Sequence, residues 1–256
     1  MKNTSSAQKM LFGIPFRGET LESIRENILK YLSNPKGSCV IQSINPEICV
    51  QMASDPEFKK AVLSSQMHIV DGVGVAVAGR MLGVPVGERF TGVDLVHMVL
   101  TDPSFRSFRV ALIGGKGNVA ERLADCYRDH KSASHIFGLK GIQDISAPTA
   151  DEEKEIFSIV AELKPQIIFF AFGSPAQEKW IHAHQAQLQG VVCAGVGGAF
   201  DFLVGDVPRA PVFMRRVGLE WLYRLIRQPW RWRRQLRLGA FVSLVLKEKF
   251  RRQPHV

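Results

Sequence analysis

Short apolar runs alternate along the chain with longer segments in which apolar positions recur at helical spacing. The runs are rich in Val, Ile, Leu and Phe, and they lie at residues 39–44, 67–71, 108–115, 135–141, 165–173 and 190–198. Continuous apolar character of this kind is typical of strands that are buried on both faces of a sheet. The pattern therefore predicts a sheet that is covered on both sides.

Helical periodicity fills the intervals between these runs. The segments with this spacing lie at residues 19–33, 48–66, 74–83, 92–101, 118–130, 151–164 and 176–188. Thr20 is a candidate N-cap for the first helix, and Asp55-Pro56 divides the second segment into two helices. Strands that alternate with helices predict an α/β fold with a mostly parallel sheet and helices on both faces.

Polar residues and glycines follow several of the predicted strands. They are Ser43-Ile44-Asn45, Asp71-Gly72, Gly114-Gly115-Lys116-Gly117 and Gly173-Ser174-Pro175-Ala176-Gln177-Glu178. Open α/β sheets bind ligands beyond the carboxyl ends of their strands. We therefore expect these residues to converge on one crevice.

The turn after the strand at 108–115 carries the pattern G-x-G-x-x-A, with Gly115, Gly117 and Ala120 at its fixed positions. The pattern raises a nucleotide-dependent oxidoreductase as one alternative, because it is typical of dinucleotide sites. Such sites need an acidic residue at the end of the next strand, where this chain has Lys140. The turn is therefore predicted either to hold a nucleotide phosphate near the helix N-terminus or to be only a tight connection.

Asp71 is the candidate for acid–base chemistry. It ends a strand and is followed by glycines that permit close approach of a ligand, so its carboxylate is placed to act as a general base. The alternative for Asp71 is a helix N-cap. Gln177 and Glu178 begin a helix, where they are candidates to hydrogen-bond a sugar or a base, with helix capping as the alternative.

Arg89 lies in a dense polar segment, ERFTGVD. Its guanidinium suits bidentate recognition of phosphate or carboxylate, whereas the alternative is a surface salt bridge with Glu88 or Asp94. No metal and no cofactor are predicted. The four cysteines are scattered without a CxxC pair or nearby histidines, which argues against a zinc site and a disulfide framework.

The positive charge of the chain is concentrated at its C-terminal end. The net charge is +9, yet residues 206–256 hold 13 Lys and Arg against 3 acidic residues, whereas residues 1–205 sum to −1. The hydrophobic content of 46% fits a packed globular body. A neutral body with a basic end favours a docking segment over a nucleic-acid-binding protein.

The basic segment has an amphipathic pattern. Leu219, Leu222, Tyr223 and Ile226 share one helical face beside Arg224 and Arg227. The pattern predicts an interfacial membrane helix, with RNA binding or packing on the protein's own body or a partner subunit as alternatives. No apolar run reaches the ~18–20 residues of a membrane span, and the N-terminus has no secretory signal, so we expect a soluble or peripheral protein.

Several motifs, spread over about residues 12–240, carry a family resemblance. In chain order they are SINPE, VDGVGV, GERFTGVD, LIGGKGNVAERLA, GSPAQEKW, VGVGGAFDFLVGDVPRAP and GLEWLYRLIRQPWRWRR. Each is modest alone, but together and in this order they resemble the WecG/TagA/CpsF family of bacterial glycosyltransferases. The resemblance implies a Rossmann-like fold, termed GT-E.

The resemblance also implies an activity: transfer of a sugar from a UDP-sugar to an undecaprenyl-diphosphate-linked saccharide, with inversion and without a metal. By motif, Asp71 corresponds to the proposed general base, and Asn45 to a polar residue beside it. Arg89 corresponds to a pocket arginine, and Gln177 to an amide on the nucleotide or sugar side. Ser43 stands where the family usually has Thr, so the hydroxyl is kept.

In similar proteins, arginines of the C-terminal appendage are thought to close over the diphosphate. In this chain the appendage arginines are Arg215, Arg216, Arg224 and Arg227. We therefore predict a Rossmann-like catalytic domain over residues 1–205 and a helical, basic membrane-docking appendage over residues 206–256.

The predicted function is inverting transfer of a hexose-type sugar to a polyprenyl-diphosphate-linked acceptor during synthesis of an exopolysaccharide or cell-envelope polymer. The predicted location is cytoplasmic, peripheral on the inner face of the plasma membrane. The expected partners are a UDP-sugar donor, an undecaprenyl-diphosphate-linked acceptor and an anionic membrane surface, but no nucleic acid. The donor sugar and a homo-oligomeric state stay open, and the alternatives are a nucleotide-dependent oxidoreductase and a nonenzymatic membrane or RNA adaptor.

Overall fold

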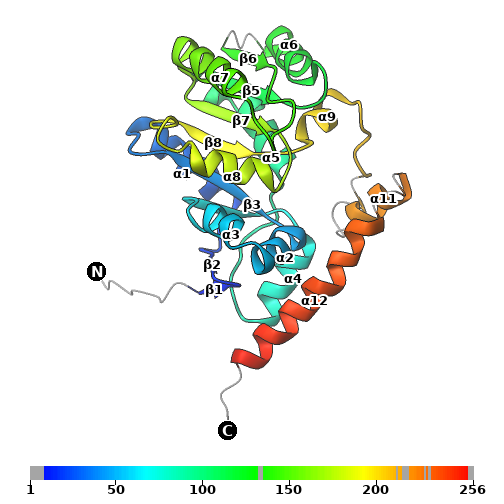
Figure 1. The fold of residues 1–256 in the computed structure, drawn as a ribbon. Helices are drawn as coiled ribbons and strands as arrows, with labels where there is room; N and C mark the ends of the chain where they lie inside the picture. The colour runs from blue at the N-terminus through cyan, green and yellow to red at the C-terminus, as the bar shows by residue number, and fades with distance from the viewer. Residues whose placement is uncertain are drawn as a thin grey trace.

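A parallel sheet forms the centre of the molecule (Figure 1). The computed structural model describes residues 9–131, 135–211, 213–214, 219–227, 229 and 232–252. The strands of the sheet are β3 (Cys39–Ile44), β4 (Met67–Val70), β5 (Val110–Gly114), β6 (Ile136–Leu139), β7 (Ile167–Ala171) and β8 (Val192–Gly195). Their order is β4-β3-β8-β7-β5-β6, and every pairing is parallel, which confirms the predicted fold class.

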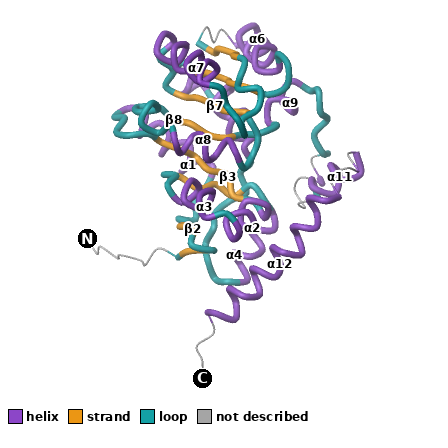
Figure 2. Tube along the Cα trace, viewed as in Figure 1, coloured by secondary structure: helices purple, strands orange, loops and turns teal. Residues whose placement is uncertain are grey.

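Helices cover both faces of the sheet (Figure 2). The helices of the body are α1 (Leu21–Ser33), α2 (Pro46–Ser54), α3 (Pro56–Leu63), α4 (Val73–Met81), α5 (Gly92–Thr101), α6 (Val119–Lys131), α7 (Ala150–Leu163), α8 (Ala176–Ala183) and α9 (Ala199–Val204), with a 3-10 turn at Pro103–Phe105. Residues of α1, α5, α6 and α9 share one core cluster with the sheet, and residues of α7 and α8 share another. Along β3, Cys39 and Ile41 point into the first cluster and Val40 into the second, which is why these three consecutive residues are all apolar.

Local signals place several helix ends where the sequence predicts them. Thr20 caps α1 in a reciprocal pair of hydrogen bonds with Ser23, so the predicted N-cap is confirmed. Asp55 ends α2 and caps α3 through the N–H of Phe58, which confirms the predicted break at Asp55-Pro56. The sequence did not predict the small antiparallel pair of β1 (Met10–Leu11) and β2 (Ile14–Pro15).

The C-terminal helices are α11 (Glu220–Arg227) and α12 (Trp232–Arg252). They lie at one side of the molecule, where α12 runs beside α2 and α4 (Figure 1). Helix α12 packs against α2, where Phe241 and Val245 join a buried cluster that includes Ile44 and Val70. Among the residues with described positions, no helix has the length and apolar character needed to cross a membrane.

The topology opens a crevice at the carboxyl ends of β3 and β8. These two strands are neighbours, but the helices that follow them pack on different parts of the molecule. The helices α2 and α3 follow β3, and α3 packs with α8, whereas α9 follows β8 and packs with α5 and α6. Divergence of adjacent connections is what creates ligand crevices in open α/β sheets. The functional site is therefore expected above this pair of strands.

Candidate functional site

A cavity of about 390 Å³ lies at these strand ends. Its walls come from the loops that follow β3, β4, β7 and β8, together with the start of α5 and one residue of α12. Five of the candidate site residues predicted from the sequence line it: Ser43, Asn45, Asp71, Gln177 and Glu178. The folded chain thus brings together residues that lie up to about 135 positions apart.

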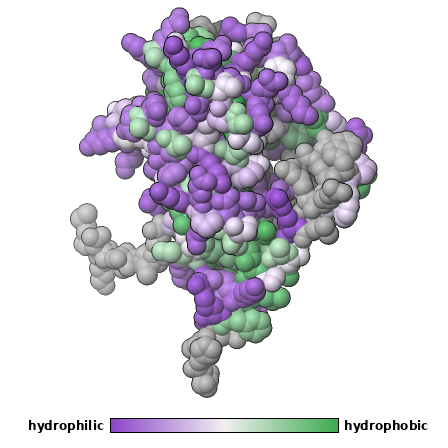
Figure 3. All heavy atoms as spheres, in the orientation of Figure 1, coloured by the Kyte–Doolittle hydropathy of each residue, from purple (hydrophilic) through white to green (hydrophobic). Residues whose placement is uncertain are grey.

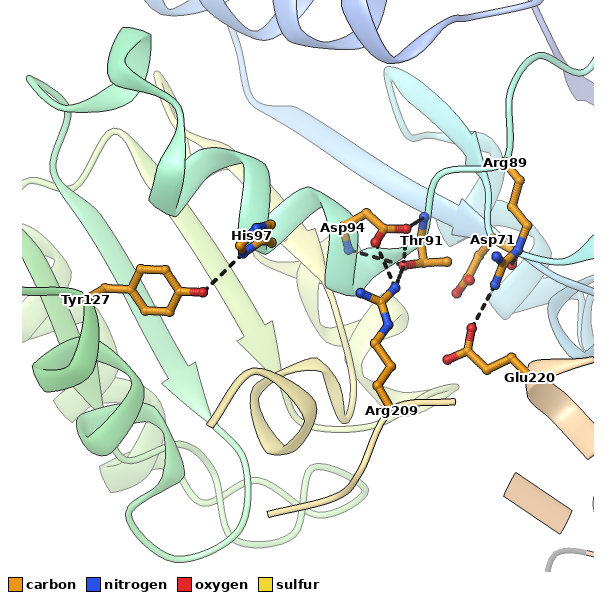
Figure 4. A network of polar contacts seen from close by, with 8 residues as sticks. All are labelled: Asp71, Arg89, Thr91, Asp94, His97, Tyr127, Arg209 and Glu220. Carbon is orange, nitrogen blue, oxygen red and sulfur yellow. Dashed lines mark hydrogen bonds and ion pairs between the residues drawn. The ribbon is translucent and has the colours of Figure 1, made fainter. Parts of the chain in front are cut away.

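Asp71 is held by main-chain contacts at the end of β4. Its N–H donates to the carbonyl of Ile44 at 2.9 Å, and its own carbonyl accepts from Nε of Arg89 at 3.2 Å. The segment that contains Arg89 runs beside β4, since the N–H of Phe90 donates to the carbonyl of Val70 at 2.7 Å. Asp71 and Arg89 therefore lie next to each other (Figure 4), although Arg89 is not among the residues that line the cavity.

Arg89 also joins the body to the C-terminal helices. One terminal nitrogen of its guanidinium lies 2.9 Å from a carboxylate oxygen of Glu220, in the first turn of α11 (Figure 4). The side chain of Glu220 is only 9% exposed, so this ion pair is largely shielded from water. Glu88 accepts from the N–H of Leu21 instead, and Asp94 pairs with Arg209.

Asn45 and Gly72 shape the junction between β3, β4 and α2. The side-chain oxygen of Asn45 accepts from the N–H of Ile48 at 3.0 Å and caps α2. A Cβ on Gly72 would lie 2.6 Å from the ring of Pro46, so only glycine permits this close approach. Asn45 therefore has a capping role as well as a place in the cavity wall.

Gln177 and Glu178 form a buried polar pair on the opposite side of the cavity. The Gln177 side-chain oxygen accepts from the N–H of Gly173 at 3.1 Å, and its Nε2 donates to Oε1 of Glu178 at 3.0 Å. The amide lies directly over Gly195 at the end of β8, where a Cβ would come within 2.8 Å of it. Burial raises the pKa of Glu178, and hydrogen bonding from Gln177, from the residue's own main-chain N–H and from the side chains of Ser174 and Gln42 only partly opposes this effect.

The glycine-rich turn after β5 is not part of this cavity wall. Gly114, Gly115 and Gly117 have backbone φ angles of +97°, +87° and +59°, which residues other than glycine rarely adopt. A Cβ on Gly115 would lie 2.3 Å from Val119, so the glycines are required by the tight turn itself. A nucleotide-binding role for the turn stays a prediction.

Several cavity residues were not predicted from the sequence. They are Gln42, Glu47, Ile48, Gln51, Thr91, Gly92, Val93, Gly195, Val196, Gly197, Gly198, Ala199, Phe202 and Arg237, whereas Gly173, Ser174 and Pro175 belong to a predicted strand end and line the cavity as expected. The glycines after β8 have a local signal, because a glycine cluster at a strand end marks close approach of a ligand. Arg237 has none: it lies in α12 and reaches the cavity only through the fold.

The predicted appendage arginines are only partly described. Arg215 and Arg216 lie outside the described residues, as does the side chain of Arg224. Arg227 is exposed at the end of α11. In the described part of the chain, no three His, Cys, Asp or Glu side chains gather in a way that would hold a metal ion.

Thr91, Asp94 and Arg209 form a polar network beside the cavity (Figure 4). Thr91 and Asp94 cap α5 reciprocally, and Arg209 lies 2.7 Å from Asp94 and 3.3 Å from the Thr91 hydroxyl. The network fixes the segment after α9 against the start of α5. It thereby holds Thr91, which is a cavity residue, in place.

The fold defines an α/β protein with a crevice at the carboxyl ends of its parallel strands. Comparison with known proteins identifies its family. The sequence matches the Glycosyl transferase WecG/TagA/CpsF family over residues 9–255. The chain therefore belongs to this family of glycosyltransferases, as the motifs indicate. Membership favours glycosyl transfer over the oxidoreductase and adaptor alternatives.

Three relatives show how far the similarity extends. All three are named N-acetylglucosaminyldiphosphoundecaprenol N-acetyl-beta-D-mannosaminyltransferase. The protein of Bacillus spizizenii is 33% identical, over 88% of this chain and 85% of its own length. The Bacillus subtilis protein is 31% identical, over 93% and 91%, and that of Staphylococcus aureus strain MRSA252 is 28% identical, over 96% and 94%.

Asp94 is expected to make stability depend on pH. Burial raises its pKa, but hydrogen bonds from Thr91 and Arg209 and the charge of Arg209 outweigh burial, so the pKa lies below its ordinary value of 3.8. A carboxyl of this kind stabilises the fold above the pKa of the unfolded chain, and its contribution is lost as the pH falls through the folded pKa. Asp94→Asn should therefore lower the melting temperature at about pH 7 and much less at about pH 3. Equal decreases at both pH values, measured by thermal unfolding, would contradict this account.

Proposed function

We propose that this protein transfers a sugar, with inversion, from a UDP-sugar to a polyprenyl-diphosphate-linked saccharide in exopolysaccharide or cell-envelope polymer synthesis. The names of the relatives support an undecaprenyl-diphosphate-linked acceptor and imply a sugar-nucleotide donor. The observation that carries the proposal is the position of Asp71, which lines the crevice at the end of β4 with an arginine beside it. A carboxylate and a cation at one strand end suit a reaction that needs a base and a stabilised anionic leaving group.

Asp71 is the proposed general base. Its carboxylate takes the proton of the acceptor hydroxyl while the hydroxyl oxygen bonds to the anomeric carbon of the donor sugar. The bond from that carbon to the β-phosphate oxygen breaks on the opposite face, so UDP leaves with the bonding electrons and the configuration inverts. Only one base is needed for this single displacement.

Arginines are proposed to stabilise the departing diphosphate. Arg237 lines the crevice from α12, and Arg89 lies at its edge beside Asp71. Arg215, Arg216, Arg224 and Arg227 belong to the same C-terminal segment. Arginine binds phosphate oxygens through two parallel N–H donors, which a lysine in the same place does not reproduce. In this proposal the C-terminal helices complete a site that the α/β body leaves open.

The remaining predicted residues are proposed to position the substrates. Ser43 contributes a hydroxyl and Asn45 an amide from the end of β3, and Gln177 contributes a second amide from the start of α8. Groups of this kind hydrogen-bond sugar hydroxyls and nucleotide oxygens without changing the charge of the site. The two amides are each anchored by a main-chain N–H, which keeps their orientation fixed before the substrate arrives.

We also propose that the C-terminal helices dock on an anionic membrane at the inner face of the plasma membrane. Large apolar side chains are exposed along them: Trp221, Ile226, Trp232, Val242, Leu246 and Phe250. Val77 and Met81 of α4 are exposed as well, and Figure 3 shows apolar surface around α4 and α12. Apolar side chains beside arginines and lysines are typical of interfacial helices, and each basic residue near an anionic surface adds about 1 kcal/mol.

Asp71→Asn should nearly abolish transfer. The amide cannot accept the proton, and a general base contributes about 10²- to 10⁴-fold to a rate. UDP release from a panel of UDP-sugars, with an undecaprenyl-diphosphate-linked N-acetylglucosamine acceptor, measures the loss. Asp151→Asn, on the exposed start of α7, is the matched control. Turnover like that of the wild type by a folded Asp71→Asn variant would overturn the assignment of the base.

The double substitution Val242→Glu and Phe250→Glu should release the protein from membranes. Both side chains are more than half exposed on α12, at 55% and 67%, so the change removes apolar contact and adds negative charge without disturbing the core. Flotation with phosphatidylglycerol-containing vesicles should show a several-fold lower bound fraction. Leu21→Glu, 45% exposed at the first residue of α1 and outside the C-terminal helices, is the control. Equal flotation of the double variant and the control would rule out docking through α12.

A further inference from the structure

A buried oxygen of Glu178 has no partner in the part of the chain that the structure describes. The residue is 5% exposed and lines the crevice, and its Oε1 accepts from Gln177. Its Oε2 makes no hydrogen bond of good geometry there, although the side chains of Ser174 and Gln42 lie close enough to the carboxyl to lower its pKa. Buried polar atoms in folded proteins are almost always paired, and an exception calls for an explanation. At a cavity wall, that explanation is a ligand atom.

The neighbours of Glu178 indicate which ligand atom fits. Gln42, Ser43, Ser174 and Gln177 line the same cavity and offer only neutral amides and hydroxyls. The one cationic side chain among the described lining residues is Arg237. A carboxyl between neutral polar groups is a poor neighbour for a phosphate, because an ionised carboxylate repels it and no adjacent cation offsets the repulsion.

A sugar hydroxyl meets these requirements. It can donate to a carboxylate oxygen or accept from a protonated carboxyl, so it pairs with Glu178 in either state. Burial raises the pKa of Glu178, which increases the share of the protonated form, and that form places an O–H donor at the cavity wall. Either state leaves the bond from Gln177 to Oε1 in place.

We infer that Glu178 is a specificity-determining residue whose Oε2 hydrogen-bonds a hydroxyl group of a saccharide in the crevice. This role rests on the proposed glycosyl transfer, and it means that Glu178 contributes to binding of the sugar but not of the nucleotide. The saccharide is either that of the donor or that of the acceptor, since both carry the same hydroxyl chemistry. Gln177 fixes the orientation of the carboxyl, and Gly195 leaves room for that amide.

Two substitutions at Glu178 separate hydrogen bonding from packing. Glu178→Leu keeps most of the volume but removes the polar atoms, whereas Glu178→Gln keeps an acceptor for Gln177 and places an N–H donor at the Oε2 position. Glu57→Gln is the control, because Glu57 is 73% exposed and pairs with Lys179, which directly follows Glu178 in the chain. Titration calorimetry gives the Kd of each protein for UDP and for the UDP-sugar that the wild type turns over, chosen from UDP-N-acetylmannosamine, UDP-N-acetylglucosamine and UDP-glucose.

Glu178→Leu should raise either the Kd of the UDP-sugar or the KM of the lipid-linked acceptor about tenfold or more, with the Kd of UDP unchanged. An effect on the UDP-sugar assigns the donor sugar, and an effect on the acceptor assigns the acceptor sugar. Glu178→Gln should recover most of the loss, and Glu57→Gln should match the wild type. An equal loss of UDP affinity, or no change in any of the three constants, would overturn the inference.

A crystal structure of the wild-type protein with the same UDP-sugar, and another with the acceptor, tests the inference without relying on the folding of a variant. One of the two should place a saccharide oxygen about 3 Å from Oε2 of Glu178. Only water or a phosphate oxygen there in both would overturn it. A wild-type protein that binds neither UDP nor any UDP-sugar overturns the proposed function itself, whereas normal binding with unchanged Glu178 variants overturns this inference alone.

Discussion

The ion pair between Arg89 and Glu220 joins the two parts of the molecule that the proposed site requires. Arg89 lies beside Asp71 at the end of β4, and Glu220 opens α11 in the C-terminal segment. The Glu220 side chain is nearly buried, so its charge depends on a nearby cation. The same segment continues into α12, where Phe241 and Val245 pack on the body and Arg237 faces the crevice. The basic tail is thus part of the site as well as a proposed membrane anchor.

The sequence predicts the strands and most helices of the body because their signals are local. β3 matches the predicted residues 39–44, and the break between α2 and α3 follows from Asp55-Pro56. The order of the strands in the sheet could not be predicted from local signals, because it depends on contacts between distant segments. The glycine-rich turn follows β5, which is separated from β3 by β7 and β8, and it is absent from the wall of the crevice. A motif at a strand end therefore predicts a site only once the order of the strands is known.

The candidate site shows the same division between local and distant signals. Asp71, Asn45 and Gln177 follow strands and were predicted from that position together with the family motifs, and all three line the crevice. Arg237 and Glu220 could not be predicted, because they meet the site only through the packing of helices that lie more than a hundred residues further along the chain than Asp71. The capping alternatives for Asp71, Gln177 and Glu178 are wrong, because Gly72 and Pro175 take the N-cap positions of α4 and α8 and no side chain caps either helix. Asn45, for which the sequence predicted no capping role, caps α2 and also lines the crevice.

If the C-terminal segment completes the site through Arg89 and Glu220, the two residues must contribute to catalysis as a unit. The most direct measurement is a double-mutant cycle on kcat/KM for sugar transfer, with Arg89→Gln, Glu220→Gln and the double variant. If the pair acts as a unit, each single substitution lowers kcat/KM about fivefold or more, and the double variant is no worse than the more damaging single one, which corresponds to a coupling energy of about 1 kcal/mol or more. If the two losses simply multiply in the double variant, the pair does not couple the C-terminal segment to catalysis, and the account is wrong.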